Sequence, residues 1–394
     1  MTVHQFTFSS PKRLIFGPGS ICQLPRISQA LGGHRILFLT GNTSFKASTA
    51  WAELTTAFAG NNARLFFVSV TKEPSPNLVD QIVKDHWDME ATLVIAVGGG
   101  SVLDAGKAVS AMMGQKESVE TYLEEVGTRT HSGGKLPFIA VPTTSGTGSE
   151  ATKNAVLSKP GPDGYKKSLR HDNFIPDLAL VDPELTLPCP ARVTAACGMD
   201  ALTQLLEAYV SVKASPMTHA LCRSGLSGFG PALARVLLED PLDIEARSCL
   251  SYGAYMSGLA LANAGLGPVH GFAGVIGAMA PNRHGQVCGT LLAETTRAII
   301  TTLQKNDPHH PSLAAYADAA VLLGIASSSL SMSPALSRLI DQLDQWVEDY
   351  KMPPLRDCGI KKEDIVTIAR KTGQKNTPTM LTLETLISIL EQRF

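Results

Sequence analysis

The chain has 394 residues, of which 44% are hydrophobic and 18% are charged, and its formal net charge is −1. This length allows about two or three domains, and the near-neutral charge argues against a nucleic-acid-binding surface, which needs a concentrated positive patch. The N-terminus lacks the apolar segment of a signal peptide, and no stretch approaches the ~18 uninterrupted apolar residues of a membrane span. We therefore expect a globular protein with neither nucleic acid nor a membrane among its partners.

The seven cysteines are scattered, odd in number and without a C-x-x-C motif. This usage favours a reducing compartment, and we expect a cytoplasmic location. We interpret all seven as small buried hydrophobic residues.

The first half of the chain alternates predicted strands with predicted helices. After a short strand around residues 13–16, strands are expected at 35–40, 64–70, 91–96, 137–142 and 177–183, and helices at 49–59, 77–87 and 100–113. Strands and helices that alternate at this spacing indicate a parallel α/β sheet.

A glycine turn follows the apolar strand at 91–96. Gly98 and Gly99 end the strand, and Ser101 offers a hydroxyl at the start of the next helix. Backbone N–H groups at such a turn can approach a phosphate, and the helix dipole favours an anion there. The pattern matches neither standard nucleotide-binding motif, and a plain tight turn is the alternative.

A second glycine- and hydroxyl-rich loop, residues 143–150, follows the strand at 137–142. Ligands of open α/β sheets bind at the carboxyl ends of the strands, so two such loops favour a nucleotide site. A flexible linker is the alternative, but the loop lies directly between ordered segments.

The second half of the chain differs from the first in its sequence pattern. From residue 188 onward, long Ala- and Leu-rich helical patterns replace the strands, for example at 243–263, 311–323 and 362–371. We predict an α/β dinucleotide-binding domain over residues 1–187 and an all-helical metal- and substrate-binding domain over residues 188–394.

The helical half contains a candidate metal site. A helix is expected to start near Gly198, which puts Asp200 and Gln204 one turn apart on one face. His270 and His284 lie fourteen positions apart, and each is followed by glycine. Imidazole and carboxylate ligands suit zinc or ferrous iron. Spacing alone leaves open that the histidines are core or helix-capping residues.

These clusters, in this order, resemble the iron-containing alcohol dehydrogenase family along essentially the whole chain. The resemblance is carried by Gly98–Lys107, Pro142–Glu150, Val181–Thr186, Gly198–Thr203 and His270–Gly274. It implies a dehydroquinate synthase-like fold with an N-terminal α/β domain and a helical C-terminal domain.

The resemblance also implies the roles of individual residues. The pyrophosphate of NAD(P) is expected on Gly98, Gly99 and Ser101, with Asp104 nearby. The further cofactor contacts expected are Thr143, Thr144, Thr147 and Lys166.

The family binds its metal with one aspartate and three histidines, and this chain supplies only three of the four. Asp200, His270 and His284 match, but Gln204 stands where a histidine is usual. Three arrangements stay open: weak coordination by Gln204, a metal held by the other three residues alone, or catalysis without metal. Fe²⁺ and Zn²⁺ are the candidate metals.

Two further departures concern the proton and the cofactor. Gly274 replaces a histidine proposed to pass protons in many members, so we assign no catalytic base and expect ribose hydroxyl and water to carry the proton. Gly41 and Asn42 stand where NAD-selective members place an aspartate, which bonds the ribose 2′-hydroxyl and repels a 2′-phosphate. We therefore expect NADPH to be tolerated or preferred.

The resulting interpretation is an NAD(P)-dependent oxidoreductase that transfers a hydride between nicotinamide and an alcohol or aldehyde, with a metal polarising the substrate oxygen. The alternatives are a metal-free maleylacetate-type reductase, a catalytically decayed nucleotide-binding protein, or, more distantly, a lyase of the dehydroquinate synthase type. The sequence leaves the particular substrate open. Relatives of the resembled family are often dimers or larger, so a homodimer is one option.

Overall fold

The computed structural model describes residues 5–60, 63–160, 164–281 and 283–394. The chain divides into two compact units. Residues 9–144 and 148–189 form the sheet unit. The described residues from 190 onward, residues 5–8 and the short segment 145–147 form the helical unit.

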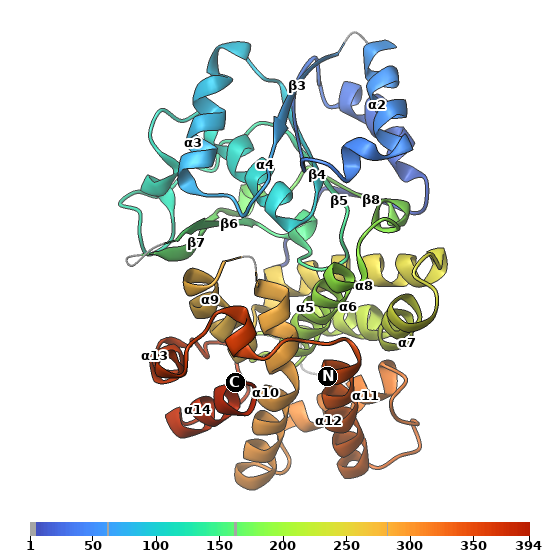
Figure 1. The fold of residues 1–394 in the computed structure, drawn as a ribbon, viewed down its shortest axis with the longest axis vertical. Coiled ribbons are helices and arrows are strands. Elements are labelled where there is room, and N and C mark those ends of the chain that lie inside the picture. The colour runs from blue at the N-terminus through green and yellow to red at the C-terminus, as the bar shows by residue number, and fades with distance from the viewer. Residues whose placement is uncertain (1–4, 61–62, 161–163, 282) are drawn as a thin grey trace. The chain divides into compact units, whose positions relative to one another are not determined.

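The sheet unit alternates strands and helices as the sequence predicts (Figure 1). Its strands are β1 (Arg13–Phe16), β2 (Arg35–Thr40), β3 (Arg64–Ser69), β4 (Leu93–Gly98), β5 (Phe138–Pro142), β6 (Asn154–Lys159), β7 (Tyr165–Arg170) and β8 (Leu178–Val181). Its α-helices are α1 (Leu24–Ala30), α2 (Thr49–Gly60), α3 (Pro76–Asp85) and α4 (Gly100–Met112). Strand β4 begins and ends two residues later than predicted, because Gly98 still pairs with the neighbouring strand.

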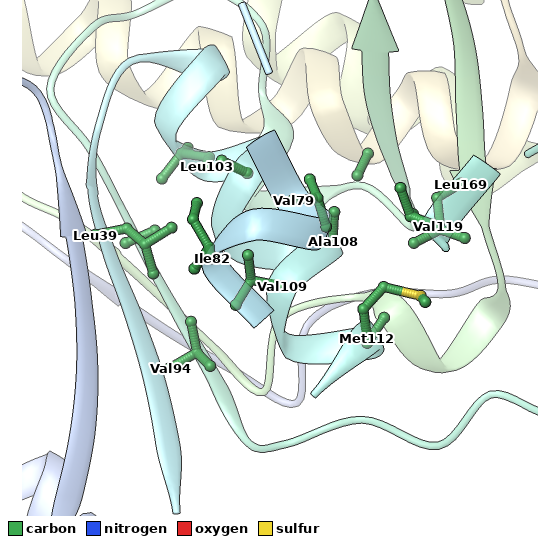
Figure 2. Close-up of a cluster of buried hydrophobic side chains, with 14 of the residues drawn as sticks. Leu39, Val79, Ile82, Val94, Leu103, Ala108, Val109, Met112, Val119 and Leu169 are labelled. Atoms are coloured by element: carbon green, nitrogen blue, oxygen red, sulfur yellow. The ribbon is translucent and has the colours of Figure 1, made fainter. Parts of the chain in front are cut away.

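Among the described residues, six strands form a parallel sheet in the order β1-β8-β5-β4-β2-β3. Both faces are covered, which explains the uninterrupted apolar runs of the strands. Leu37 and Leu39 pack on the α3 and α4 side, whereas Ile36 and Phe38 pack with α1 and α2. Figure 2 shows the cluster on the α3 and α4 side. The predicted α/β fold class is confirmed.

The antiparallel pair of β6 and β7 was not predicted from the sequence. Only a few of its residues are apolar and buried, among them Leu157 and Leu169, which join the α4 cluster. Several other positions are charged or polar, such as Lys166, Lys167 and Ser168. A strand with one thin apolar face gives a weak sequence pattern.

The helical unit is built from helices, and its described residues contain no strand. Its α-helices are α5 (Ala191–Tyr209), α6 (Pro216–Leu226), α7 (Phe229–Ala234), α8 (Ile244–Ala264), α9 (Pro268–Met279), α10 (His284–Asn306), α11 (Pro311–Leu322), α12 (Met332–Asp349), α13 (Ile365–Lys371) and α14 (Leu383–Gln392).

The predicted helix start near Gly198 is wrong, because α5 already begins at Ala191, directly after Pro190. Gly198 lies inside the helix and serves packing. A Cβ at this position would stand 2.5 Å from Leu233 Cδ1, so only glycine lets that side chain approach.

Within the described part of the chain, no single helix is long and apolar enough to cross a membrane. Only α8 and α9 taken together, with a 96° bend between them, reach that length and composition.

Candidate active site

Three loops of the sheet unit leave from the same edge of the sheet. Strands β2, β4 and β5 are adjacent and parallel, so their carboxyl ends lie side by side. Gly41 and Asn42 follow β2, Gly98 ends β4, and Thr143 follows β5. The backbone N–H of Thr143 donates to the Gly98 carbonyl over 3.0 Å. The predicted glycine and threonine loops therefore form one continuous edge.

Glycine is required where β4 turns into α4. A Cβ on Gly98 would stand 2.5 Å from Val102 Cγ2, and the β-branched valine cannot move aside. Gly99 precedes the first helical residue, and its Cα lies against Thr144, whose Oγ1 would be 3.5 Å from an added Cβ. Ser101 lies in the first turn of α4. A helix N-terminus with so little side-chain cover is suited to bind a phosphate.

Two of the expected cofactor residues have partners within the sheet unit. Asp104 accepts hydrogen bonds from Ser149 Oγ at 2.6 Å and from the Val156 N–H at 3.1 Å. Lys166 Nζ lies 3.0 Å from a carboxylate oxygen of Glu73. Burial raises the pKa of Asp104. Asp104 therefore fastens α4 to the segment that follows the threonine loop.

Thr147 belongs to the helical unit together with its two preceding residues. Ser145 Oγ lies 2.9 Å from Ser251 Oγ, and a Cβ on Gly146 would stand 2.7 Å from Cys197 Cβ. Residues of the loop at 143–150 thus belong to both units. This arrangement does not fit the alternative interpretation of the loop as a flexible linker.

A buried lysine that the sequence interpretation overlooked supports the glycine turn. Lys107 is fully buried, and its Nζ lies within 3.1 Å of oxygens of Ser149, Thr152 and Asn154. Burial lowers the pKa of Lys107 to about 8 and raises the pKa of nearby Glu150 to about 7. The sequence signal was a lysine in a mostly apolar helical segment whose only other charged residue is Asp104.

In the helical unit, three helices bring four potential metal ligands together. Asp200 comes from α5, His270 from the first turn of α9, and His284 and Cys288 from the first turns of α10. One ligand atom of each residue lies within 4.8 Å of those of the others. The sequence predicted the first three of these residues.

The distances within this cluster are short. The Nε2 atoms of His270 and His284 lie 3.3 and 3.8 Å from Asp200 Oδ1. Each of these nitrogens lies 3.8 Å from Cys288 Sγ. Glycines let the helices approach so closely, since a Cβ on Gly285 would stand 2.5 Å from the Ala196 carbonyl oxygen.

Glu207, which the sequence interpretation missed, orients His270. Its Oε2 lies 2.7 Å from His270 Nδ1, and its Oε1 accepts the Val269 N–H at 2.7 Å. A carboxylate that holds the Nδ1 proton fixes the tautomer and turns the Nε2 lone pair toward the cluster. The available signal was spacing, because Glu207 lies two helical turns after Asp200 on the same helix.

The cluster has the properties of a cation site. Asp200 is 2% exposed, and among the described residues its Oδ1 has no hydrogen-bond partner despite the two nearby imidazoles. Burial acts to raise the pKa of Asp200, but the two imidazoles outweigh it and keep this pKa below its ordinary value. Burial raises the pKa of the Cys288 thiol to about 12. Buried carboxylate, imidazole and thiol donors that share one point fit a divalent metal.

Gln204 lies one turn after Asp200 and is buried, but its Oε1 accepts a hydrogen bond from Ser257 Oγ at 2.8 Å.

The interpretation of the cysteines as uniformly buried hydrophobic residues is wrong. Cys22 is exposed, and Cys288 lies among the candidate ligands.

Comparison with protein families is consistent with this geometry. The family model for iron-containing alcohol dehydrogenase matches residues 11–183, and the model for the C-terminal part of the same family matches residues 194–394. The chain belongs to the iron-containing alcohol dehydrogenase family.

Individual relatives agree over nearly their full length. The long-chain-alcohol dehydrogenase 1 of Geobacillus thermodenitrificans is 33% identical over 373 residues, which cover 93% of this chain and 91% of the relative. A crystal structure of a 1,3-propanediol oxidoreductase shares 27% identity with a TM-score of 0.88, over 99% of this chain and 100% of that one. The sulfoacetaldehyde reductase of Bifidobacterium kashiwanohense, solved with NAD⁺, shares 25% identity with a TM-score of 0.84, over 99% of both chains.

These matches confirm the predicted dehydroquinate synthase-like fold and the predicted activity class. The protein is an oxidoreductase that acts on the CH–OH group and transfers a hydride between an alcohol and an aldehyde. The family uses NAD(H) with a divalent metal. The relatives do not favour a maleylacetate-type reductase or a decayed nucleotide-binding protein.

Proposed function

We propose that residues 1–187 bind the dinucleotide and that residues 188–394 hold a divalent metal, for reversible NAD(P)-linked interconversion of an alcohol and an aldehyde. The observation that carries this proposal is the convergence of Asp200, His270 and His284 on one point.

Asp200, His270 and His284 are the residues proposed to hold the metal, and Gln204 is the alternative fourth donor that the sequence suggested. A divalent metal in this position supplies Lewis-acid polarisation of the substrate oxygen. Glu207 contributes by holding the Nδ1 proton of His270, so that Nε2 presents its lone pair. His284 has a side chain that is 30% exposed, which leaves an approach for a small substrate.

Gly98, Gly99 and Ser101 are the residues proposed to bind the pyrophosphate, through backbone N–H groups and one hydroxyl. The proposed contacts around the rest of the cofactor are Thr143, Thr144, Thr147 and Lys166, and Asp104 is proposed to support them from nearby. The nicotinamide supplies or accepts the hydride. Asp104 acts indirectly, because its oxygens already accept hydrogen bonds from Ser149 and Val156.

The turn that follows β2 supports the proposal that the protein binds NADPH. No described heavy atom lies within 4 Å of an added Cβ at Gly41, and Asn42 is exposed. Lys46 Nζ binds Ser69 Oγ at 2.8 Å, next to the paired ends of β2 and β3. An open turn with an ammonium group nearby suits a 2′-phosphate.

The cofactor proposal is tested by comparing kcat/KM for NADH and NADPH. We expect Lys46→Ala to lower kcat/KM for NADPH several-fold and to leave that for NADH unchanged. A hundredfold preference of the wild-type enzyme for NADH would contradict it.

The activity is tested by following nicotinamide absorbance with a panel of aliphatic aldehydes, both cofactors and the purified protein. Stoichiometric oxidation of NAD(P)H with formation of the alcohol is expected. Cofactor binding without turnover on any aldehyde, or turnover with no net change in absorbance, would contradict the proposal.

We further propose a cytoplasmic location and a homodimer. The seven cysteines form no disulfide, which suits a reducing compartment. Light scattering of the purified protein tests the oligomeric state.

A further inference from the structure

Helix α10 contributes two donors to the cluster rather than the one that the sequence pattern indicated. His284 and Cys288 lie four residues apart and therefore on the same face of the helix. We propose that Cys288 binds the metal as a thiolate, so that the ligand set is one aspartate, two histidines and one cysteine. This inference rests on the proposed metal site.

The geometry supports four-coordination. A tetrahedral centre with bonds of about 2.0 Å to nitrogen and oxygen and about 2.3 Å to sulfur separates its ligand atoms by about 3.3–3.6 Å. The separations from the two imidazole nitrogens to Asp200 Oδ1 and to Cys288 Sγ run from 3.3 to 3.8 Å, and all four ligand atoms lie within 4.8 Å of one another. One ion placed among these atoms reaches all four with only small side-chain adjustments.

The competing donor, Gln204, is engaged elsewhere. Its carbonyl oxygen accepts the Ser257 hydroxyl at 2.8 Å, and Ser257 itself is fully buried. A neutral amide oxygen is also a weaker ligand for zinc or ferrous iron than a thiolate. Cys288 therefore supplies the fourth donor that the change to Gln204 removed.

Binding requires loss of the thiol proton. The S–H bond breaks, the sulfur keeps the electron pair and donates it to the metal, and the proton leaves to solvent. A thiolate also changes the choice of metal, because sulfur ligands favour zinc over harder ions. Four protein donors remain compatible with catalysis, since zinc can expand to five-coordination.

X-ray absorption of the zinc-loaded wild-type protein tests this directly and requires no variant. We expect one sulfur scatterer at about 2.3 Å together with a nitrogen and oxygen shell at about 2.0 Å. Bound zinc with only nitrogen and oxygen neighbours would overturn the role of Cys288 and leave the metal site standing. A protein that binds no zinc, iron or cobalt would overturn the metal site and the thiolate together.

Variants give a second readout with cobalt in place of zinc. The wild-type cobalt protein should show a sulfur-to-cobalt charge-transfer band, and Cys288→Ala and Cys288→Ser should abolish it. The matched control is Cys222→Ala, which removes another fully buried cysteine of the helical unit that is outside the cluster. A band that survives in Cys288→Ala, or that disappears in Cys222→Ala, would contradict the assignment.

A chelator competition quantifies the contribution of each donor. Cys288→Ser should lower the metal affinity by more than tenfold. Loss of a residue that only supports a ligand already costs about 10–100-fold in metal affinity, and loss of a ligand should cost no less. Gln204→Ala should retain metal like the wild type. The reverse order would assign the fourth position to Gln204.

Discussion

The two halves of the proposed active site are built in different ways. At the sheet edge, glycines and threonines follow strand ends directly, and the proposed cofactor contacts are mainly backbone groups and short side chains. In the helical unit, side chains from α5, α9 and α10 must converge although Asp200 and Cys288 are far apart in the chain. The first arrangement follows from local sequence, whereas the second depends on how helices pack.

This contrast predicts that the two regions respond to different substitutions. The helical cluster should be sensitive to changes of single donor atoms. The sheet edge should be sensitive to added volume rather than to lost functional groups.

The largest effect is expected for Asp200→Ala, which removes the buried carboxylate from the cluster. Metal content and activity should be lost together, with kcat/KM for aldehyde reduction lower by about 10³-fold or more, corresponding to several kcal/mol of Lewis-acid stabilisation. Elemental analysis and steady-state kinetics check this. NADH binding, measured by fluorescence titration, should stay intact, and a variant that keeps both metal and activity would refute the ligand assignment.

A smaller effect is expected for Glu207→Gln, which keeps the shape of the side chain but removes the charge that orients His270. Metal affinity should fall by about 10–100-fold, as for other supporting residues of metal sites. A chelator competition measures this affinity. Unchanged affinity would show that the carboxylate serves only to cap α9 through Val269.

At the sheet edge, Gly98→Ala should weaken binding of the dinucleotide by about tenfold and lower the free energy of unfolding by about 1–3 kcal/mol, because the new methyl group collides with Val102. The matched control is Gly114→Ala, just beyond the other end of α4, where no described heavy atom lies within 4 Å of the added Cβ. Metal content should be normal in both variants. Equal cofactor affinity in the two would argue against close packing at the turn.

The smallest effect on activity is expected from Glu150→Gln, which tests the buried charges beneath the glycine turn. Burial raises the pKa of Glu150 from 4.5 to about 7, so the folded protein holds a proton that the unfolded chain has already lost between these values. This group therefore lowers the free energy of unfolding as the pH rises through that range, by about 3 kcal/mol once the pH is above both values.

The variant should lack this part of the pH dependence. Urea unfolding at about pH 5 and about pH 8 should show Glu150→Gln gaining stability relative to the wild type only at the higher pH. A difference between the two proteins that is the same at both pH values would contradict the buried, titrating carboxyl group.

Much of the sheet unit could be predicted because its signals are local. Apolar runs that end in glycine give β4 and its turn, and the strand at 137–142 leads directly into the threonine loop. The strands β6 and β7 were missed because so few of their side chains are apolar. Lys107 was missed because the partners of a buried charge lie far along the chain.

The metal cluster could be predicted only in part. Asp200, His270 and His284 were found because their residue types and spacing match a family pattern. Cys288 and Glu207 are outside that pattern: helical spacing puts them on the same faces as His284 and Asp200, but only the packing of α5, α9 and α10 brings them to the imidazoles. Their discovery therefore required the three-dimensional structure.

Reconstitution of the stripped protein tests the central claim most directly. The wild-type enzyme is dialysed against a strong chelator, and aldehyde reduction is then measured while zinc or ferrous iron is added in steps. The account predicts an inactive stripped protein whose activity is restored in proportion to bound metal and saturates at one ion per chain, with no restoration in Asp200→Ala. Full activity of the wild-type protein after all metal has been removed would contradict it.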